Sequence, residues 1–178
     1  MKYAFSILAL IFVLLAIVNN LSTRDVVVGG MNVLSPSPYD ALLAKPADER
    51  IAIPIRGVKK FQIADTWQAP RGSARKHQGQ DIFAKKGTPV YSATDGFVVR
   101  VGESRLGGNT VFVMGAGGRV YYYAHLDSFR PGLAHGEQVS RDSVIGYVGS
   151  TGNAKGTPPH LHFGVYTLGG AINPITLF

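Results

Sequence analysis

The sequence predicts an all-β domain, folded as a compact antiparallel sandwich or open barrel. Downstream of Pro46, short runs rich in β-branched and aromatic residues alternate with glycine-bearing turns. No segment of that region has a convincing 3.6-residue hydrophobic period, and most of the 22 glycines lie at the joints between the runs. The predicted strands are Val90–Ala93, Phe97–Gly102, Thr110–Met114, Val120–His125, Val144–Gly149 and Leu161–Tyr166, with hairpin turns at Asp95-Gly96 and Ala116–Gly118.

The chain begins with a strongly apolar run over residues 3–18, and no charged residue occurs between Lys2 and Arg24. A helix over residues 3–21 would be about 28 Å long, close to the ~30 Å hydrocarbon core of a bilayer. The segment Val18–Ser22 lacks the small residues of a good signal-peptidase site. We therefore expect residues 1–21 to be a transmembrane signal-anchor rather than a cleaved signal peptide.

Residues 22–56 are predicted to be a linker or lead-in that contains one short helix. Ser37 is the expected N-cap, Pro38 occupies the first helical position, and Asp40 completes a capping box. Lys45-Pro46 then ends the helix, because proline cannot continue it. The β-rich domain is expected to span residues 57–178.

The composition restricts the possible partners and the possible metal ligands. Lys and Arg exceed Asp and Glu by 7, and the sequence pI is about 9.8, which suits an anionic polymer such as nucleic acid, acidic lipid or a carboxylate-bearing cell wall. No basic run is interleaved with aromatic residues in a nucleic-acid-binding pattern, so nucleic acid is not the expected partner. The chain has no cysteine, so any metal ion must be held by His, Asp or Glu.

Two histidine motifs could hold such an ion. His160 and His162 lie in an extended segment, where alternation places both side chains on one face. His77 and Asp81 flank Gly79, which allows a loop to bend so that an imidazole and a carboxylate converge as the chain enters a strand. Each motif alone is also compatible with packed or exposed side chains.

A third histidine ends the aromatic strand. Alternation predicts that Tyr121, Tyr123 and His125 share one face of that strand. His135 lies in a turn-rich loop and is expected to be an exposed bystander.

Together these motifs match the requirements of a catalytic zinc site, which has three protein ligands and one open position. His77, Asp81 and one of the pair His160 and His162 could provide two imidazoles and a carboxylate. The remaining histidine of that pair and His125 would then perform acid–base chemistry, for which an imidazole pKa near ~6.5 is suited. The helical HExxH motif of other metalloproteases is absent from the sequence.

With these motifs, the sequence resembles the lysostaphin-type (LytM-like) zinc metallopeptidases, a family of peptidoglycan hydrolases. The resemblance extends from about residue 65 to residue 174. The shared segments are Asp65–Trp67, Ala69–Arg71, His77–Ile82, Gly87–Val90, Asp95-Gly96, Gly108-Asn109, Tyr123–Leu126, Ile145–Gly152 and Pro159–Phe163. Two positions depart from the family pattern, namely Gln68 in place of a common glycine and Gly164 in place of a frequent glutamate.

The resemblance implies a site and an activity. It implies one zinc ion bound by His77, Asp81 and His162. It also implies that His125 and His160 form the catalytic pair. The implied enzyme is a zinc metalloendopeptidase that hydrolyses peptide cross-links of bacterial peptidoglycan, and we expect a D,D-endopeptidase.

The resemblance also bears on substrate contacts and location. Asn109 and Tyr123 are candidate substrate-binding residues, although turn formation and packing are equally compatible roles. With the N-terminal anchor, the expected location is the bacterial inner membrane, single-pass, with the catalytic domain in the periplasm. Secretion after signal cleavage is the alternative.

Three alternative hypotheses remain at the level of the sequence. The chain could be a non-catalytic relative that binds the cell wall and activates another hydrolase. It could hold a structural zinc ion without activity. The lead-in over residues 22–56 could also lie across the groove and suppress activity.

Overall fold

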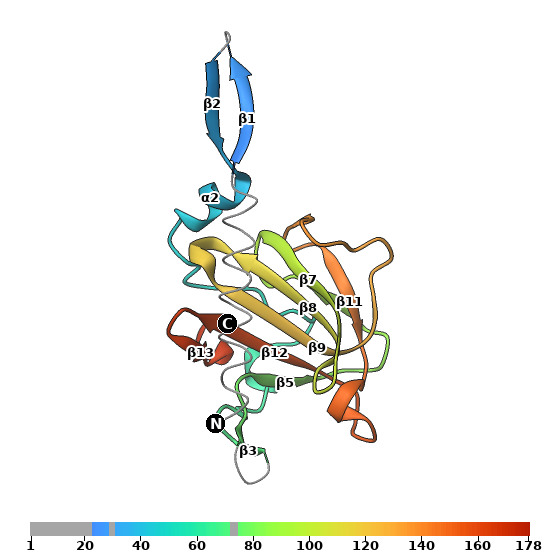
Figure 1. Ribbon diagram of the computed structural model, residues 1–178. Coiled ribbons are helices and arrows are strands. Elements are labelled where there is room, and N and C mark those ends of the chain that lie inside the picture. The colour runs from blue at the N-terminus through green and yellow to red at the C-terminus, as the bar shows by residue number, and fades with distance from the viewer. Residues whose placement is uncertain (1–22, 29–30, 72–74) are drawn as a thin grey trace.

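A nine-stranded antiparallel sheet forms the body of the protein in the computed structural model, which describes residues 23–28, 31–71 and 75–178 (Figure 1). Its strands are β5 (Gln80–Phe83), β6 (Pro89–Tyr91), β7 (Gly96–Ser104), β8 (Gly108–Gly115), β9 (Val120–Phe129), β10 (Gln138–Val139), β11 (Val144–Val148), β12 (His160–Thr167) and β13 (Gly170–Ile172). Strand order along one path is β10-β7-β8-β9-β11-β6, and β12 pairs with β9, β5 and β13. The prediction of a mostly β, antiparallel domain is confirmed.

Strand β9 is the point at which the sheet divides. Its first half pairs with β12, whereas its second half pairs with β11. At the division, Ala124 and His125 stand opposite the single residue Thr110 of β8, which is a β-bulge. His125 has a φ of 62°, a left-handed conformation that is uncommon for a residue other than glycine.

The bulge changes the face to which His125 belongs. Tyr121 and Tyr123 are wholly buried in the core, whereas the ring of His125 lies beside those of His160 and His162. The prediction that Tyr121, Tyr123 and His125 share one face is therefore wrong, because simple alternation does not continue through a bulge.

The main core lies on the side of the sheet opposite the histidines and includes Ile82 of β5 and both Leu161 and Phe163 of β12. It also contains Ile51 and Ile55, so part of the expected lead-in belongs to the folded body. The backbone N–H of Ile51 donates to the carbonyl of Leu177, which ties this segment to the C-terminal end. The folded body thus begins upstream of residue 57.

Six predicted strands are present with shifted ends, but one predicted turn is wrong. Asp95-Gly96 does not join a hairpin, because β6 pairs with β11 and β7 pairs with β8 and β10. The turn at Ala116–Gly118 does join a hairpin, between β8 and β9. The remaining short elements are β3 (Pro70–Arg71), β4 (Arg75–Lys76) and the 3-10 turns η1 (Lys60–Gln62), η2 (Ala116–Gly118), η3 (Gly152–Ala154) and η4 (Pro174–Thr176).

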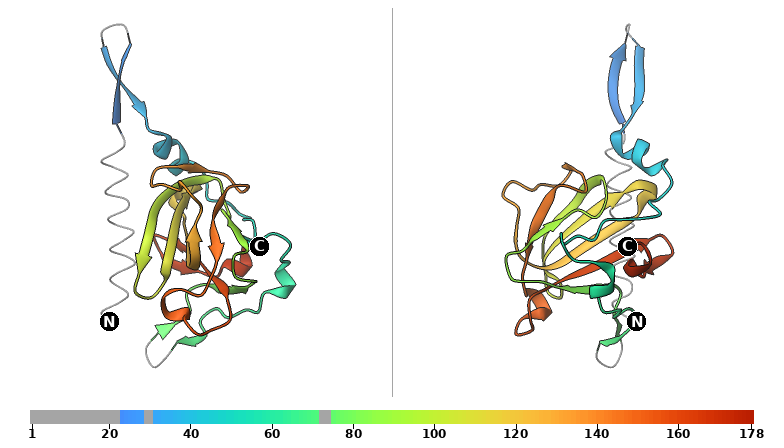
Figure 2. Two further views of the ribbon diagram at one scale, coloured as in Figure 1. Left: turned by 90° about the vertical axis from the view of Figure 1, so that its right-hand side faces the viewer. Right: turned by 180° about the vertical axis from the view of Figure 1, so that it is seen from behind.

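The lead-in contains the expected helix and an unexpected hairpin. Helix α2 (Pro38–Leu43) has Ser37 as N-cap and a complete capping box with Asp40. It packs against a second cluster that includes Phe112 and Tyr166. The hairpin of β1 (Thr23–Val28) and β2 (Met31–Pro36) projects away from the sheet, as both views in Figure 2 show.

The expected membrane anchor, residues 1–21, lies outside the described residues. Within the part of the chain that the structure describes, no helix is both long enough and apolar enough to cross a membrane.

Candidate metal centre

Five histidine and aspartate side chains from three strands and one loop meet on one face of the sheet. His77 directly follows β4, and Asp81 lies on β5. Strand β12 runs between β5 and β9, and its register places His162 opposite both Asp81 and Ala124. His160 lies two residues before His162 on the same face, as alternation predicts.

Three of these side chains form a tight group. His77 Nε2 lies 2.8 Å from His162 Nδ1, and each of these nitrogens lies 3.1 Å from Asp81 Oδ1. His160 Nε2 is farther from the same carboxylate oxygen, at 3.9 Å. Among the described residues, His77, Asp81 and His162 are the one set of His, Asp and Glu side chains close enough to share an ion.

This donor set fits zinc. For tetrahedral zinc with bonds of about 2.0–2.1 Å, neighbouring donor atoms lie roughly 3.3–3.4 Å apart, so the separations here require only a small outward movement. Two imidazoles and one carboxylate are also the donor types of catalytic zinc sites, which keep one position open. The sequence left either His160 or His162 as the third ligand. The shorter distance of His162 from Asp81 favours His162 in that position.

Contacts around the group orient the two imidazoles. His77 Nδ1 lies 3.0 Å from the carbonyl oxygen of Thr66, so this nitrogen carries the proton and Nε2 faces the group. The ring of His162 lies directly against Gly79, where an added Cβ would be 2.8 Å from His162 Cε1. Gly79 is therefore required for the close approach of this ring and not for a left-handed bend, since its φ is not positive.

The carboxylate of Asp81 is held in its ionised form. Burial raises the pKa of Asp81, but hydrogen bonds with His162 and His77 outweigh burial and hold the pKa well below its ordinary value. The guanidinium of Arg71 donates to Asp81 Oδ2 and adds to this effect. Since Arg71 occupies Oδ2, Oδ1 remains directed at the two imidazoles. Burial also lowers the pKa of His162, which favours the neutral imidazole that a metal ion requires.

His125 and His160 are arranged alike beside this group. The Nδ1 of His125 lies 2.9 Å from the carbonyl oxygen of Thr151, and the Nδ1 of His160 lies 2.8 Å from that of Pro158. Each ring therefore donates through Nδ1 and retains a free Nε2. Burial, followed by the neighbouring charges of His162 and His160, lowers the pKa of His125 to about 4. His125 is consequently a neutral base at physiological pH.

The structure places the two candidate substrate-binding residues in supporting positions. Tyr123 is wholly buried, and its hydroxyl accepts a hydrogen bond from the backbone N–H of Ala93, which favours packing over substrate contact. The amide of Asn109 donates to the carbonyls of Leu126 and Asp127 and so braces the chain just after His125.

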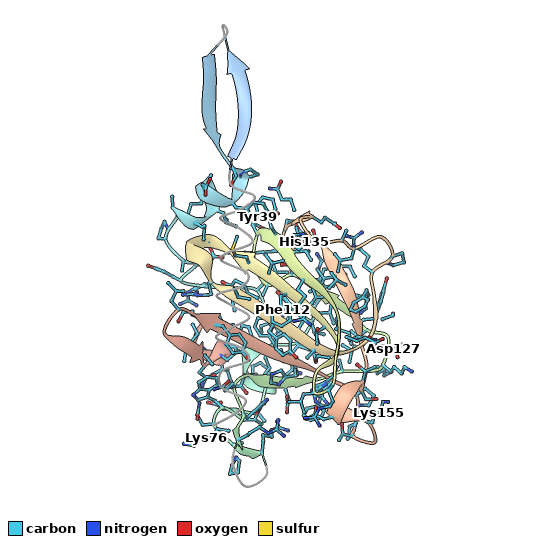
Figure 3. The ribbon with its side chains drawn as sticks, viewed as in Figure 1. Tyr39, Lys76, Phe112, Asp127, His135 and Lys155 are labelled. Atoms are coloured by element: carbon cyan, nitrogen blue, oxygen red, sulfur yellow. The ribbon has the colours of Figure 1, made fainter. Side chains whose placement is uncertain are left out.

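The fifth histidine, His135, lies away from the centre. In Figure 3 it is found near Tyr39, far from Lys76, the residue that directly precedes His77. This position agrees with its expected role as a bystander.

The sequence-based reasoning gave no role to Arg71, to Thr66 or to Thr151. All three lie in segments that match the family pattern, which is the one signal that the sequence offers for them. Thr66 and Thr151 act through backbone carbonyls, so their residue types carry no information about the contact.

Comparison with known proteins gives the family. A profile described as Peptidase family M23 matches residues 75–174, more than half of the chain. The chain belongs to peptidase family M23. The L-Ala--D-Glu endopeptidase of Bacillus subtilis (strain 168) is 40% identical over 121 residues, which cover 64% of this chain and 36% of that protein. The DD-carboxypeptidase/endopeptidase Mpg of Neisseria meningitidis serogroup B is 38% identical over 128 residues, which cover 72% of this chain and 27% of that protein.

A solved structure of a zinc-containing peptidase from Vibrio cholerae shares the fold of the M23 domain. It has a TM-score of 0.59 and 28% identity, and the match covers 74% of this chain and 40% of that one. The chain spans between about a quarter and about a third of the length of these two curated relatives.

Proposed function

We propose that this M23 protein is a zinc-dependent endopeptidase that hydrolyses peptide cross-links of bacterial peptidoglycan. The observation that carries the proposal is the convergence of His77, Asp81 and His162 beside two further imidazoles, His125 and His160, that do not belong to the ligand group. A structural zinc site is usually closed by four protein ligands. A three-ligand group flanked by free bases is instead the arrangement of a hydrolytic site.

In this proposal the ligand group His77, Asp81 and His162 holds one zinc ion, which supplies Lewis acidity for the scissile carbonyl and for water. The Nε2 atoms of His125 and His160 perform the proton transfers. One accepts a proton from the attacking water as the carbon–oxygen bond forms. A proton is returned to the leaving nitrogen as the peptide bond breaks, so the reaction consumes one water molecule. The carbonyls of Thr151 and Pro158 keep both rings in the required tautomer.

We further propose that the bond hydrolysed is the D,D cross-link. The names of the two relatives cover two bond types, L-Ala–D-Glu and a DD bond. Mass analysis of purified cross-linked muropeptides, incubated with the full chain with and without a chelator, tests both. A D,D-endopeptidase converts a dimer into two monomers with intact stems. Cleavage between L-Ala and D-Glu instead leaves L-Ala on the sugar and releases the rest of the stem peptide. Absence of any chelator-sensitive product would refute the enzymatic proposal.

We also propose that residues 1–21 anchor the protein in the bacterial inner membrane, with the catalytic domain in the periplasm. The apolar run without charge between Lys2 and Arg24 supports this location. Cell fractionation combined with protease treatment of spheroplasts tests it. Recovery of a shortened chain in the medium would favour secretion after signal cleavage.

The rival function is a wall-binding protein that activates another hydrolase. The presence of all five site residues in one cluster supports catalysis over this rival, since an activator has no need of them. Inhibition by the lead-in is not supported either. Among residues 37–56, no hydrogen bond or ion pair reaches any of the five site residues.

A further inference from the structure

One buried polar side chain beneath the metal centre has no part in the proposed chemistry. Gln80 is wholly buried, although glutamine is usually exposed. It lies on β5, directly before Asp81, and stands opposite the core residue Phe163 of β12. Since adjacent residues of a strand face opposite sides, Gln80 lies beneath the sheet while Asp81 faces the group of ligands.

The amide of Gln80 uses its full hydrogen-bonding capacity. Its Oε1 accepts from the backbone N–H of Thr66 at 2.9 Å and from the Thr66 hydroxyl at 3.1 Å. Its Nε2 donates to Asp65 Oδ1 at 2.6 Å and to Asn173 Oδ1 at 2.9 Å. A primary amide can make four such bonds, and this one makes all four. A buried network that is fully satisfied is rigid and specific.

The segment that Gln80 holds is the one that orients a ligand. The N–H and the hydroxyl of Thr66 both donate to Gln80 Oε1, and the carboxylate of the preceding Asp65 accepts from Gln80 Nε2. The carbonyl of Thr66 is in turn the acceptor for His77 Nδ1. The same carbonyl also accepts from the backbone N–H of Ala69 at 3.1 Å, so Gln80 and this turn together set where it lies, and the carbonyl orients His77.

We propose that Gln80 is a positioning residue for the metal centre, acting through Thr66 on His77. By fixing the Thr66 carbonyl it keeps the His77 proton on Nδ1 and directs Nε2 at the ligand group. Asn173, which begins the turn η4, anchors the network to the C-terminal end of the chain. This inference rests on the proposed zinc binding, but it concerns a residue that touches neither ion nor substrate.

The test compares the full chain with Gln80→Met, which keeps the length of the side chain but removes its polar atoms. The first readout is the zinc dissociation constant from chelator competition, measured without substrate. The second is the tautomer of His77 in the metal-free protein, from nitrogen-15 NMR of labelled histidine. Removal of partners that orient a ligand typically weakens metal affinity by roughly 10- to 100-fold, and we expect a loss in that range with His77 no longer confined to the Nδ1–H form.

The matched control is Thr94→Val. Thr94 is also wholly buried, but its hydroxyl donates to Asp48 and to a neighbouring carbonyl rather than to any residue of the site. This change should lower stability without altering zinc affinity. Equal zinc affinity in Gln80→Met and the parent protein would overturn the proposal, as would equal losses in Gln80→Met and Thr94→Val.

A second pair of variants covers the case in which Gln80→Met does not fold. Gln80→Glu replaces the donor toward Asp65 with an acceptor and places two carboxylates together, so zinc affinity should fall. Combining it with Asp65→Asn restores a donor and an acceptor at that contact and removes the charge repulsion, so affinity should recover in part, while the bond to Asn173 Oδ1 stays lost. Absence of recovery would contradict the proposed path through the segment at residues 65–66. Failure of the parent protein to bind zinc would instead refute the proposed function.

Discussion

Replacing Gly79 with alanine tests the idea that a glycine is needed because His162 and β12 lie directly against it. A Cβ at position 79 would lie 2.6 Å from the carbonyl oxygen of Phe163 and 2.8 Å from His162 Cε1. The first of these atoms belongs to the backbone of a central strand and cannot rotate away. Either the loop or the metal ligand must therefore move.

The size of the effect follows from these distances. Reaching an ordinary contact of about 3.4 Å requires a displacement of roughly 0.6–0.8 Å at the carbonyl or at the imidazole of His162. Overpacking of this kind typically costs about 1–3 kcal/mol of stability. Metal–ligand distances tolerate only about 0.2 Å, so Gly79→Ala should also weaken zinc binding by at least about tenfold.

Zinc affinity is measured by chelator competition, and stability by urea denaturation of the metal-free protein. Gly102→Ala is the matched control, because a Cβ there would meet no atom within 4 Å. It should leave zinc affinity unchanged. Our reasoning would be refuted if Gly79→Ala bound zinc as tightly as Gly102→Ala and unfolded at the same urea concentration.

Three further predictions follow from the site and the core. His125→Ala should retain zinc but lower kcat about 10²–10⁴-fold for cross-linked muropeptides, and loss of zinc would contradict its placement outside the ligand set. Between pH 7 and pH 5 the metal-free protein should lose about 2 kcal/mol of stability through His125, whose pKa of about 4 lies below the unfolded value near 6.5. In that window the unfolded chain binds more protons than the folded one, so the free energy of unfolding decreases as the pH is lowered. Urea titrations at several pH values should show a smaller decrease for His125→Ala. Tyr123→Phe should cost about 1–3 kcal/mol with unchanged zinc affinity, because it leaves the N–H of Ala93 unpaired in the core, and an altered metal site would argue against a packing role.

The sequence predicted the local features of the fold well. The capping box of α2 was readable because its partners, Ser37 and Asp40, are three residues apart. The shared face of His160 and His162 followed from strand alternation over two residues. The prediction of a hairpin turn at Asp95-Gly96 is wrong, because a favourable turn sequence does not specify which strands pair. Strand β6 pairs with β11 instead.

The site itself was predictable in composition but not in geometry. The absence of cysteine and the spacing of the motifs limited a metal ion to histidine and aspartate ligands. The bulge that turns His125 toward the site has no equally clear sequence signal, since a residue other than glycine occupies its left-handed position. The roles of Thr66 and Thr151 could not be read either, because backbone carbonyls orient the imidazoles.

The sequence by itself thus determined which donor types the protein could offer and that His160 and His162 share one face of their strand, but not the face of His125. Only the tertiary structure decided that His77 and His162, 85 positions apart, point their nitrogens at one carboxylate oxygen. The physical reason is that face and residue type are local properties, whereas convergence depends on the register between β5, β12 and β9 and on the buried contacts that hold the loops against them.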